Sequence, residues 1–121
     1  MHHATQAYGK VAKQTSSARD LEADLLLKAA AQLQAISDNW DTKAREVDGA
    51  LLYNRRLWSI LVTSVTEQAN PLPAQVRQNV ANLGIFVMNH TLSLMAEPKR
   101  EKLGTLISIN RELAAGLMGR G

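Results

Sequence analysis

The chain contains no cysteine in its 121 residues. This absence excludes disulfides, thiolate metal sites and cysteine nucleophiles, and it agrees with the reducing environment of the cytoplasm. Aromatic residues make up only 4% of the chain, so aliphatic side chains and alanine must fill the core. That composition favours closely packed helices over a β-sandwich, which draws on β-branched and aromatic residues.

Long apolar runs and a strong charge of one sign are also missing. No segment reaches the roughly 18 consecutive apolar residues of a membrane span, and Met1-His2-His3-Ala4 lacks the pattern of a signal peptide. The net charge is +3 with both signs mixed, which is too small to identify a nucleic-acid binder. We therefore expect one cytoplasmic domain over residues 1–121, without membrane insertion.

The sequence has little that resembles catalytic machinery. Its histidines are His2, His3 and His90, and His90 lies on an apolar stripe with no Asp, Glu or His at metal-ligand spacing. We expect His90 to be half-buried and hydrogen-bonded, not a ligand or a general base. No P-loop, phosphate cradle or nucleophile elbow is present, and the carboxylates are scattered. The prediction is a non-enzymatic protein with no catalytic residue, cofactor or metal.

The pattern that is present is helical periodicity. It predicts an all-α fold, a compact bundle of four long helices plus a short N-terminal helix. The short helix is expected over about 5–14, before the cap cluster Thr15-Ser16-Ser17, with Ala7, Tyr8, Val11 and Ala12 on its apolar side. With the short helix counted as the first, the long helices are the second to the fifth, and they are expected to end near Asp38, Ala69, Ala96 and Met118. The third is expected to start near Thr42 and the fourth at Pro73.

Three of the long helices have one stripe of residues expected to face the core. The stripe of the second is Leu21, Leu25, Leu26, Ala29, Leu33 and Ile36; that of the third is Val47, Ala50, Leu51, Asn54, Leu57, Trp58, Leu61 and Val65, widened by Tyr53, Ile60 and Val62; that of the fifth is Leu103, Leu106, Ile107, Asn110, Leu113, Ala114 and Leu117. Gly49 interrupts the third helix, where glycine costs about 1 kcal/mol relative to alanine, and a close helix crossing there would explain it. Arg19 and Glu22 are spaced to pair along a helix edge.

Two asparagines on these stripes allow two interpretations. The first, which we favour, is that Asn54 and Asn110 are buried amides that fix the helix register. The second is that they donate hydrogen bonds to the backbone of a partner.

The fourth helix is apolar on two sides. One stripe consists of Val76, Val80, Leu83, Val87, His90 and Leu94. The second consists of Ala81, Ile85, Met88, Leu92 and Met95. Its methionines make a soft surface that adapts to varied apolar partners. Two interpretations stay open: another helix of the chain covers this second stripe, or it is a binding surface.

Two small basic groups flank these helices. Arg55 and Arg56 sit beside the stripe of the third helix, as a solvated face or as contacts to carboxylates or phosphates. Lys99, Arg100 and Lys102 begin the fifth helix. Nucleic-acid contact therefore stays an alternative.

Several short motifs follow one another along the chain. They are Ala7-Tyr8, Arg19 with Glu22, Ala50-Leu51, Asn54-Arg55-Arg56-Leu57-Trp58, Asn70-Pro71-Leu72-Pro73, Asn82-Leu83-Gly84-Ile85-Phe86-Val87, Leu106-Ile107-Ser108-Ile109-Asn110-Arg111 and Ala114-Ala115-Gly116-Leu117. In this order and spacing the chain resembles the FlaF flagellar biosynthesis regulators of alphaproteobacteria over nearly its whole length. It departs from them over residues 64–68, which are less acidic than the resemblance leads us to expect.

The resemblance implies a cytoplasmic, all-helical, non-enzymatic protein. It implies a chaperone-like factor that binds flagellin and supports its synthesis, export and filament assembly. The alternative that it implies is a post-transcriptional regulator acting on flagellin mRNA, directly or through an FlbT-like partner.

A physical mechanism suits the first of these. Amphipathic terminal segments of flagellin would dock as a helix in a groove, while arginines steer acidic partner residues without supplying much affinity. The expected partner-binding residues are Ile85, Met88, Leu92, Met95, Leu72, Trp58, Arg55 and Arg56.

Overall fold

The computed structural model describes residues 2–119, with side chains from Ala18 to Gly119. It contains α1 (His2–Asp38), α2 (Trp40–Lys43), the 3-10 turn η1 (Ala44–Glu46), α3 (Val47–Thr66), α4 (Ala74–Ala96), the 3-10 turn η2 (Arg100–Lys102) and α5 (Leu103–Leu117). No strand occurs within residues 2–119. The predicted all-α fold with four long helices is confirmed.

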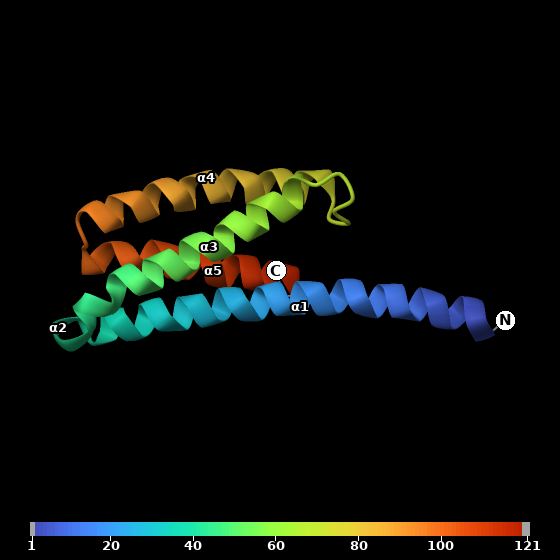
Figure 1. Ribbon diagram of the computed structural model, residues 1–121, viewed down its shortest axis with the longest axis horizontal. Helices are drawn as coiled ribbons and strands as arrows, with labels where there is room; N and C mark the ends of the chain where they lie inside the picture. Colours follow the sequence, from blue (N-terminus) through green and yellow to red (C-terminus); the bar gives the residue numbers. More distant parts are fainter. Residues whose placement is uncertain (1, 120–121) are drawn as a thin grey trace.

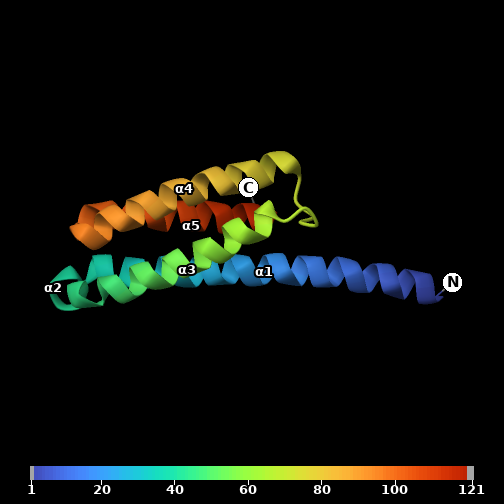
Figure 2. The same cartoon turned by 45° about the horizontal axis from the view of Figure 1, so that its top comes forward.

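The long helices form two antiparallel pairs (Figure 1). One pair is α1 with α5, and the other is α3 with α4, while α3 also packs against α1. Figure 2 shows the same arrangement after rotation, with the N-terminal part of α1 extending past the ends of the other helices. α3 is therefore the helix that joins the two pairs.

The separate short N-terminal helix is not found. α1 is continuous from His2 to Asp38 and passes through Thr15-Ser16-Ser17 without a break. Serine and threonine lower helix propensity by only a few tenths of a kcal/mol (up to about 0.7) each, so a cluster of them without proline does not end a helix. The predicted apolar side of the short helix, Ala7, Tyr8, Val11 and Ala12, lies outside the side chains that the structure describes.

The third helix is shorter than predicted. Its expected first turn is divided into α2 and η1, and α3 runs only from Val47 to Thr66. The side chain of Asn39 donates to the carbonyl of Ala35 (2.9 Å), satisfying an acceptor at the end of α1. Ending α1 in this way reverses the chain direction and brings α3 back along α1.

The core lies between the two pairs, and the face of α3 that lines it was predicted correctly. All eight stripe residues of α3 are buried, whereas Ile60, which was expected to widen that face, is 67% exposed. On α1, in contrast, Leu21 was expected to face the core but is 59% exposed.

The close helix crossing occurs at a different glycine from the one predicted. A Cβ at Gly49 would meet nothing within 4 Å, so the packing of this chain does not require glycine there. At Gly84 on α4, a Cβ would overlap Cγ2 of Val62 and lie 3.8 Å from the Trp58 ring. Gly84 is therefore the position where α4 packs closest to α3.

Candidate functional site

A buried polar network joins α1, α3 and α5. The indole nitrogen of Trp58 donates to Oδ1 of Asn110 (2.9 Å). The Asn110 amide nitrogen donates to Oδ1 of Asn54 (2.7 Å) and to the carbonyl of Leu26 (3.3 Å). The side chains of Trp58, Asn54 and Asn110 are fully buried, which confirms the interpretation of both asparagines as buried amides.

This network corrects one predicted site residue. Trp58 has 0% exposure, so no partner contacts its side chain, and the prediction that it belongs to the binding surface is wrong. The physical reason is that a buried indole N–H needs an acceptor, and Asn110 provides one inside the fold. The aromatic residue of the Asn54–Trp58 motif therefore holds helices together.

The second stripe of α4 is open at its centre. Ile85 is 63% exposed and Leu92 is 52% exposed, and Met88, between them, is half-buried. Positions i, i+3 and i+7 share one face of a helix. We call Ile85, Met88 and Leu92 the outer row. Met95, the next residue of the predicted stripe, packs partly against the core.

The outer row is exposed because α4 uses another face for the core. Its buried residues are Val80, Gly84, Val87, Thr91 and Leu94. Gly84 presses this face onto α3, which leaves the outer row at the edge of the α3–α4 pair.

The remaining predicted site residues fall in two places. Arg55 and Arg56 are exposed on α3. Arg55 lies two helical turns before Val62 on the same face, which is the side of α3 that α4 packs against. Leu72 is half-buried and packs against the core beyond the end of α3, away from the outer row.

An exposed aromatic residue on another side of α4 was not among the predicted site residues. The ring of Phe86, 47% exposed, stacks on the ring of His90, with centroids 5.5 Å apart. His90 donates from Nε2 to the carbonyl of Lys102 (2.9 Å) and so ties α4 to η2. This confirms the expectation of a half-buried, hydrogen-bonded histidine.

The segment between α3 and α4 is held by hydrogen bonds to the end of α3. The Asn70 amide nitrogen donates to the carbonyl and the hydroxyl of Ser64 (3.0 and 3.2 Å), and Asn70 Oδ1 accepts from the backbone N–H of Leu72 (3.0 Å). Nε of Arg77 donates to the carbonyl of Val65 (2.8 Å). These bonds satisfy carbonyls that the helix end leaves unpaired, and they fix Leu72 in position.

Beside this segment lies a pocket of about 300 Å³, which we call the Arg19 pocket. It is lined by Ala18, Arg19 and Glu22 of α1 and by Ser64, Asn70, Pro71 and Leu72. Two motifs far apart in the sequence, Arg19 with Glu22 and Asn70-Pro71-Leu72, thus meet at one place. Periodicity alone did not indicate this, because it depends on how α1 crosses α3.

The charged groups of the Arg19 pocket are incompletely satisfied. Nε of Arg19 is buried and has no hydrogen-bond partner. Burial raises the pKa of the Glu22 carboxyl, and the charge of Arg19 acts against that increase. The predicted Arg19–Glu22 ion pair is not formed, since among the residues with described side chains the salt bridge found joins Lys99 and Glu97 (3.7 Å).

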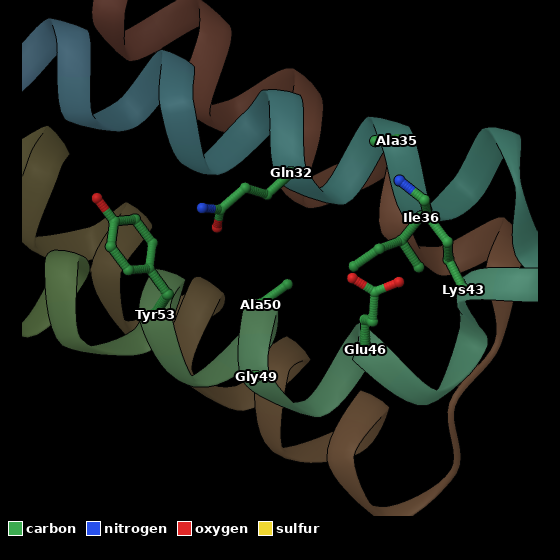
Figure 3. A pocket seen from close by; sticks show the side chains of 8 residues that line it. All are labelled: Gln32, Ala35, Ile36, Lys43, Glu46, Gly49, Ala50 and Tyr53. Carbon is green, nitrogen blue, oxygen red and sulfur yellow. The ribbon is translucent and has the colours of Figure 1, made fainter.

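A further pocket, of about 420 Å³, lies between α1 and α3 near η1 (Figure 3). Lys43 and Glu46 stand at one end and Gln32 and Tyr53 at the other. The ammonium of Lys28 lies 5.8 Å from the centroid of the Tyr53 ring. The part of the chain with described side chains has no group of three or more His, Asp or Glu residues that could hold a metal ion.

The fold also bears on membrane contact. Between residues 2 and 119, no helix combines the length and apolar character needed to cross a bilayer.

Comparison with models of protein families matches residues 4–117 to the family described as flagellar protein FlaF. No curated protein and no solved structure matches the chain. The matched range includes both the outer row and the Arg19 pocket.

Proposed function

Because the chain belongs to the FlaF family of flagellar proteins, we propose that it is a cytoplasmic, chaperone-like factor that binds flagellin through the outer row of α4. The observation that carries this proposal is the exposure of Ile85 and Leu92 on one face of α4, at 63% and 52%. Apolar side chains arranged on one helix face are the complement of an amphipathic segment.

The outer row has the spacing that such a segment needs. Ile85, Met88 and Leu92 stand at i, i+3 and i+7, and an amphipathic helix anchors through residues at the same intervals. Burying one large aliphatic side chain contributes about 1.5–3 kcal/mol. Met88 has an unbranched, adaptable side chain, which suits a surface that receives segments of varied shape.

A chaperone role follows from what such binding would do. A segment that becomes helical only when it assembles exposes its apolar stripe before assembly, and exposed apolar stripes drive aggregation. Covering that stripe with the outer row would keep the segment soluble until export. The interaction is apolar and involves few residues, so it is compatible with later release of the segment.

Charge would act on the rate of encounter. Arg55 is exposed on the side of α3 next to α4, so acidic residues of the partner would be drawn toward the outer row. Surface charges of this kind change the association rate more than the affinity. Arg56 lies about 100° further round α3, and we assign it a smaller part in steering.

The test is the affinity for purified monomeric flagellin, measured by isothermal titration calorimetry. The double variant Ile85→Glu with Leu92→Glu removes the apolar contacts and keeps good helix formers in α4. We expect affinity to fall roughly 100-fold, because two buried aliphatic contacts are lost. Circular dichroism should be unchanged.

The matched control is Ile60→Glu. Ile60 is 67% exposed on α3 and outside the outer row, so it makes the same chemical change elsewhere. The control should bind like the native protein. Equal affinity of the double variant and the native protein, or an equal loss in the control, would contradict the proposal.

The rival function is regulation of flagellin mRNA, directly or through an FlbT-like partner. Binding to phosphates makes the logarithm of the affinity fall linearly with the logarithm of salt concentration, whereas an apolar contact through the outer row is nearly insensitive to salt. A salt-sensitive complex with flagellin mRNA, weakened by Arg55→Gln with Arg56→Gln and formed without flagellin binding, would replace our proposal by this rival.

A further inference from the structure

We infer that the protein forms a dimer through α1. The α1 helices of two copies would run antiparallel, so that residues 18–25 of one copy pack against residues 7–14 of the other. The surface is separate from the outer row of α4, and its partner is a second copy of this chain, so the inference does not depend on flagellin binding.

The first argument is an exposed leucine on α1. Leu21 is 59% exposed, although the same helix buries another face in the core. Ala18, one turn earlier, is also exposed, and Leu25, one turn later, is half-buried. Residues at these spacings lie on one side of a helix. We call Ala18, Leu21 and Leu25 the Leu21 strip, and its centre is open to a partner.

The second argument is that the side of α1 that carries the Leu21 strip continues along the N-terminal part of the helix. α1 is continuous from His2 to Asp38, and its N-terminal part extends past the ends of the other helices (Figure 2). The sequence has Ala7, Val11 and Gln14 at alternating intervals of four and three before the strip. Such spacing is the pattern of helices that pair along a common seam.

The third argument is the distribution of charge, which identifies the partner. Residues 1–18 contain Lys10 and Lys13 and no acidic residue, whereas Asp20 and Asp24 follow soon afterwards. Within residues 18–119, neither aspartate forms a salt bridge. At about 100° per residue, all four charged positions fall along the same edge of the strip. The basic half and the acidic half of this edge are complementary to each other.

Only an antiparallel pair uses this complementarity. A two-fold axis between antiparallel helices places each edge of the strip beside the same edge of the other copy. A register that sets Val11 level with the partner's Leu21 then brings Lys10 next to the partner's Asp24. The apolar spacing and the charges therefore specify the same register, and the symmetry repeats both contacts at the two ends of the pair.

The first experiment measures the weight-average mass of the native protein by sedimentation equilibrium. We expect the mass to rise from 13.3 kDa, the mass of one chain, toward twice that value as the protein concentration increases. Leu21→Glu should weaken the dimer about 100-fold, because each dimer contains the Leu21 contact twice. The matched control is Ile60→Glu, at a 67% exposed position of α3, which should associate like the native protein.

The second experiment exchanges the charges. One variant carries Lys10→Glu with Lys13→Glu, and the other carries Asp20→Lys with Asp24→Lys. Each variant alone should remain monomeric, because like charges then meet at both ends of the pair. An equimolar mixture should recover the association of the native protein, because opposite charges meet again. Misfolded variants would not recover on mixing, so this comparison stays decisive.

The third experiment tests the direction of the helices. The chain has no cysteine, so Lys10→Cys and Asp24→Cys each introduce a single thiol. These positions are about 21 Å apart along α1. With the short thiol cross-linker bismaleimidoethane, a mixture of the two variants should yield the mixed dimer, identified by its mass, while each variant alone should stay largely unlinked.

Four results would overturn the inference. They are a native mass that stays at one chain from micromolar to millimolar concentration, native association of Leu21→Glu, no recovery in the charge-exchanged mixture, and cross-linking of each cysteine variant to itself. The last result would mean that the helices pair in parallel. None of these measurements involves flagellin, so failure here leaves the proposed function untouched.

Discussion

α3 and α4 lie side by side but use their apolar residues differently. On α3, every residue of the stripe is buried between the two helix pairs. On α4, one apolar face is buried while Ile85 and Leu92 on another remain open. α4 thus has more apolar surface than the core of this chain covers. The difference separates apolar residues that build the fold from apolar residues that are available to a partner.

The largest effect on stability is expected from the buried polar network that joins α3 to α5 and α1. Asn110→Ala removes the acceptor of the Trp58 indole and the donor to Asn54 and Leu26. We expect the free energy of unfolding to fall by about 3 kcal/mol, because buried polar groups lose their partners. Urea denaturation measures this change.

The control for that variant is Asn89→Ala on the exposed part of α4. It should change stability by no more than about 0.5 kcal/mol. If both variants shift the urea midpoint equally, the network does not stabilise the fold and the distinction between the two helices loses its energetic basis.

The next effect concerns the contact between the two helices. Gly84→Ala places a Cβ against Val62, and we expect a loss of about 1–3 kcal/mol from overpacking. Adding Val62→Ala should recover part of that loss, which a double-mutant cycle would detect.

Gly49→Ala is the matched substitution in open space. It should stabilise the protein by up to about 1 kcal/mol, because alanine is the better helix former. Thermal unfolding of both glycine variants compares them directly. If Gly84→Ala leaves the thermal stability unchanged while Gly49→Ala lowers it, the close helix crossing has been placed at the wrong residue.

A smaller effect on stability is expected from substitutions in the outer row of α4. Ile85→Glu with Leu92→Glu should change the free energy of unfolding by no more than about 0.5 kcal/mol for each substitution, since neither side chain is buried. The urea midpoint is again the measurement. A loss of several kcal/mol would mean that the outer row belongs to the core, which would remove the contrast between α3 and α4.

The sequence predicted α3 well for a physical reason. Its eight stripe residues repeat at helical spacing, and a single buried face is what such spacing specifies. The same reasoning could not decide which apolar side of α4 faces the core, because both sides have the same period. That choice depends on Gly84, whose role appears only when α4 is placed against Val62.

Tertiary contacts also explain the errors. Periodicity placed Trp58 on the core stripe of α3, and the prediction that it also belongs to the binding surface failed because its indole is buried against Asn110, 52 residues away in the sequence. The break at Thr15-Ser16-Ser17 was predicted from capping preferences, which a continuous helix overrides. The Arg19 pocket combines residues of α1 with the segment after α3, and no local pattern indicates such a meeting.

The smallest effect is a pH dependence at the edge of the Arg19 pocket. Burial raises the pKa of Glu22 above its ordinary value. At pH values between the ordinary pKa of glutamate and the raised pKa of Glu22, the Glu22 carboxyl binds more protons in the folded state than in the unfolded state. The stability that Glu22 contributes is therefore present at low pH and is lost as the pH rises through the folded-state pKa.

Glu22→Gln removes this titration. Its stability relative to the native protein should therefore be more favourable at pH 7 than at about pH 3, where Glu22 is protonated in both states. Thermal unfolding of the variant and the native protein at both pH values measures this difference. The contributions of the other titrating groups cancel because both proteins contain them. A relative stability that declines toward pH 7 would show that the attraction of Arg19 outweighs burial.

The most direct test of the account is which methionine methyl groups sense flagellin. The chain has four methionines; Met88 lies in the outer row, and Met118 packs at the far end of α5. In protein labelled with 13C at the methionine methyls, the account predicts that added flagellin shifts the Met88 signal and leaves the Met118 signal in place. A shift of Met118 with an unchanged Met88 signal would contradict it.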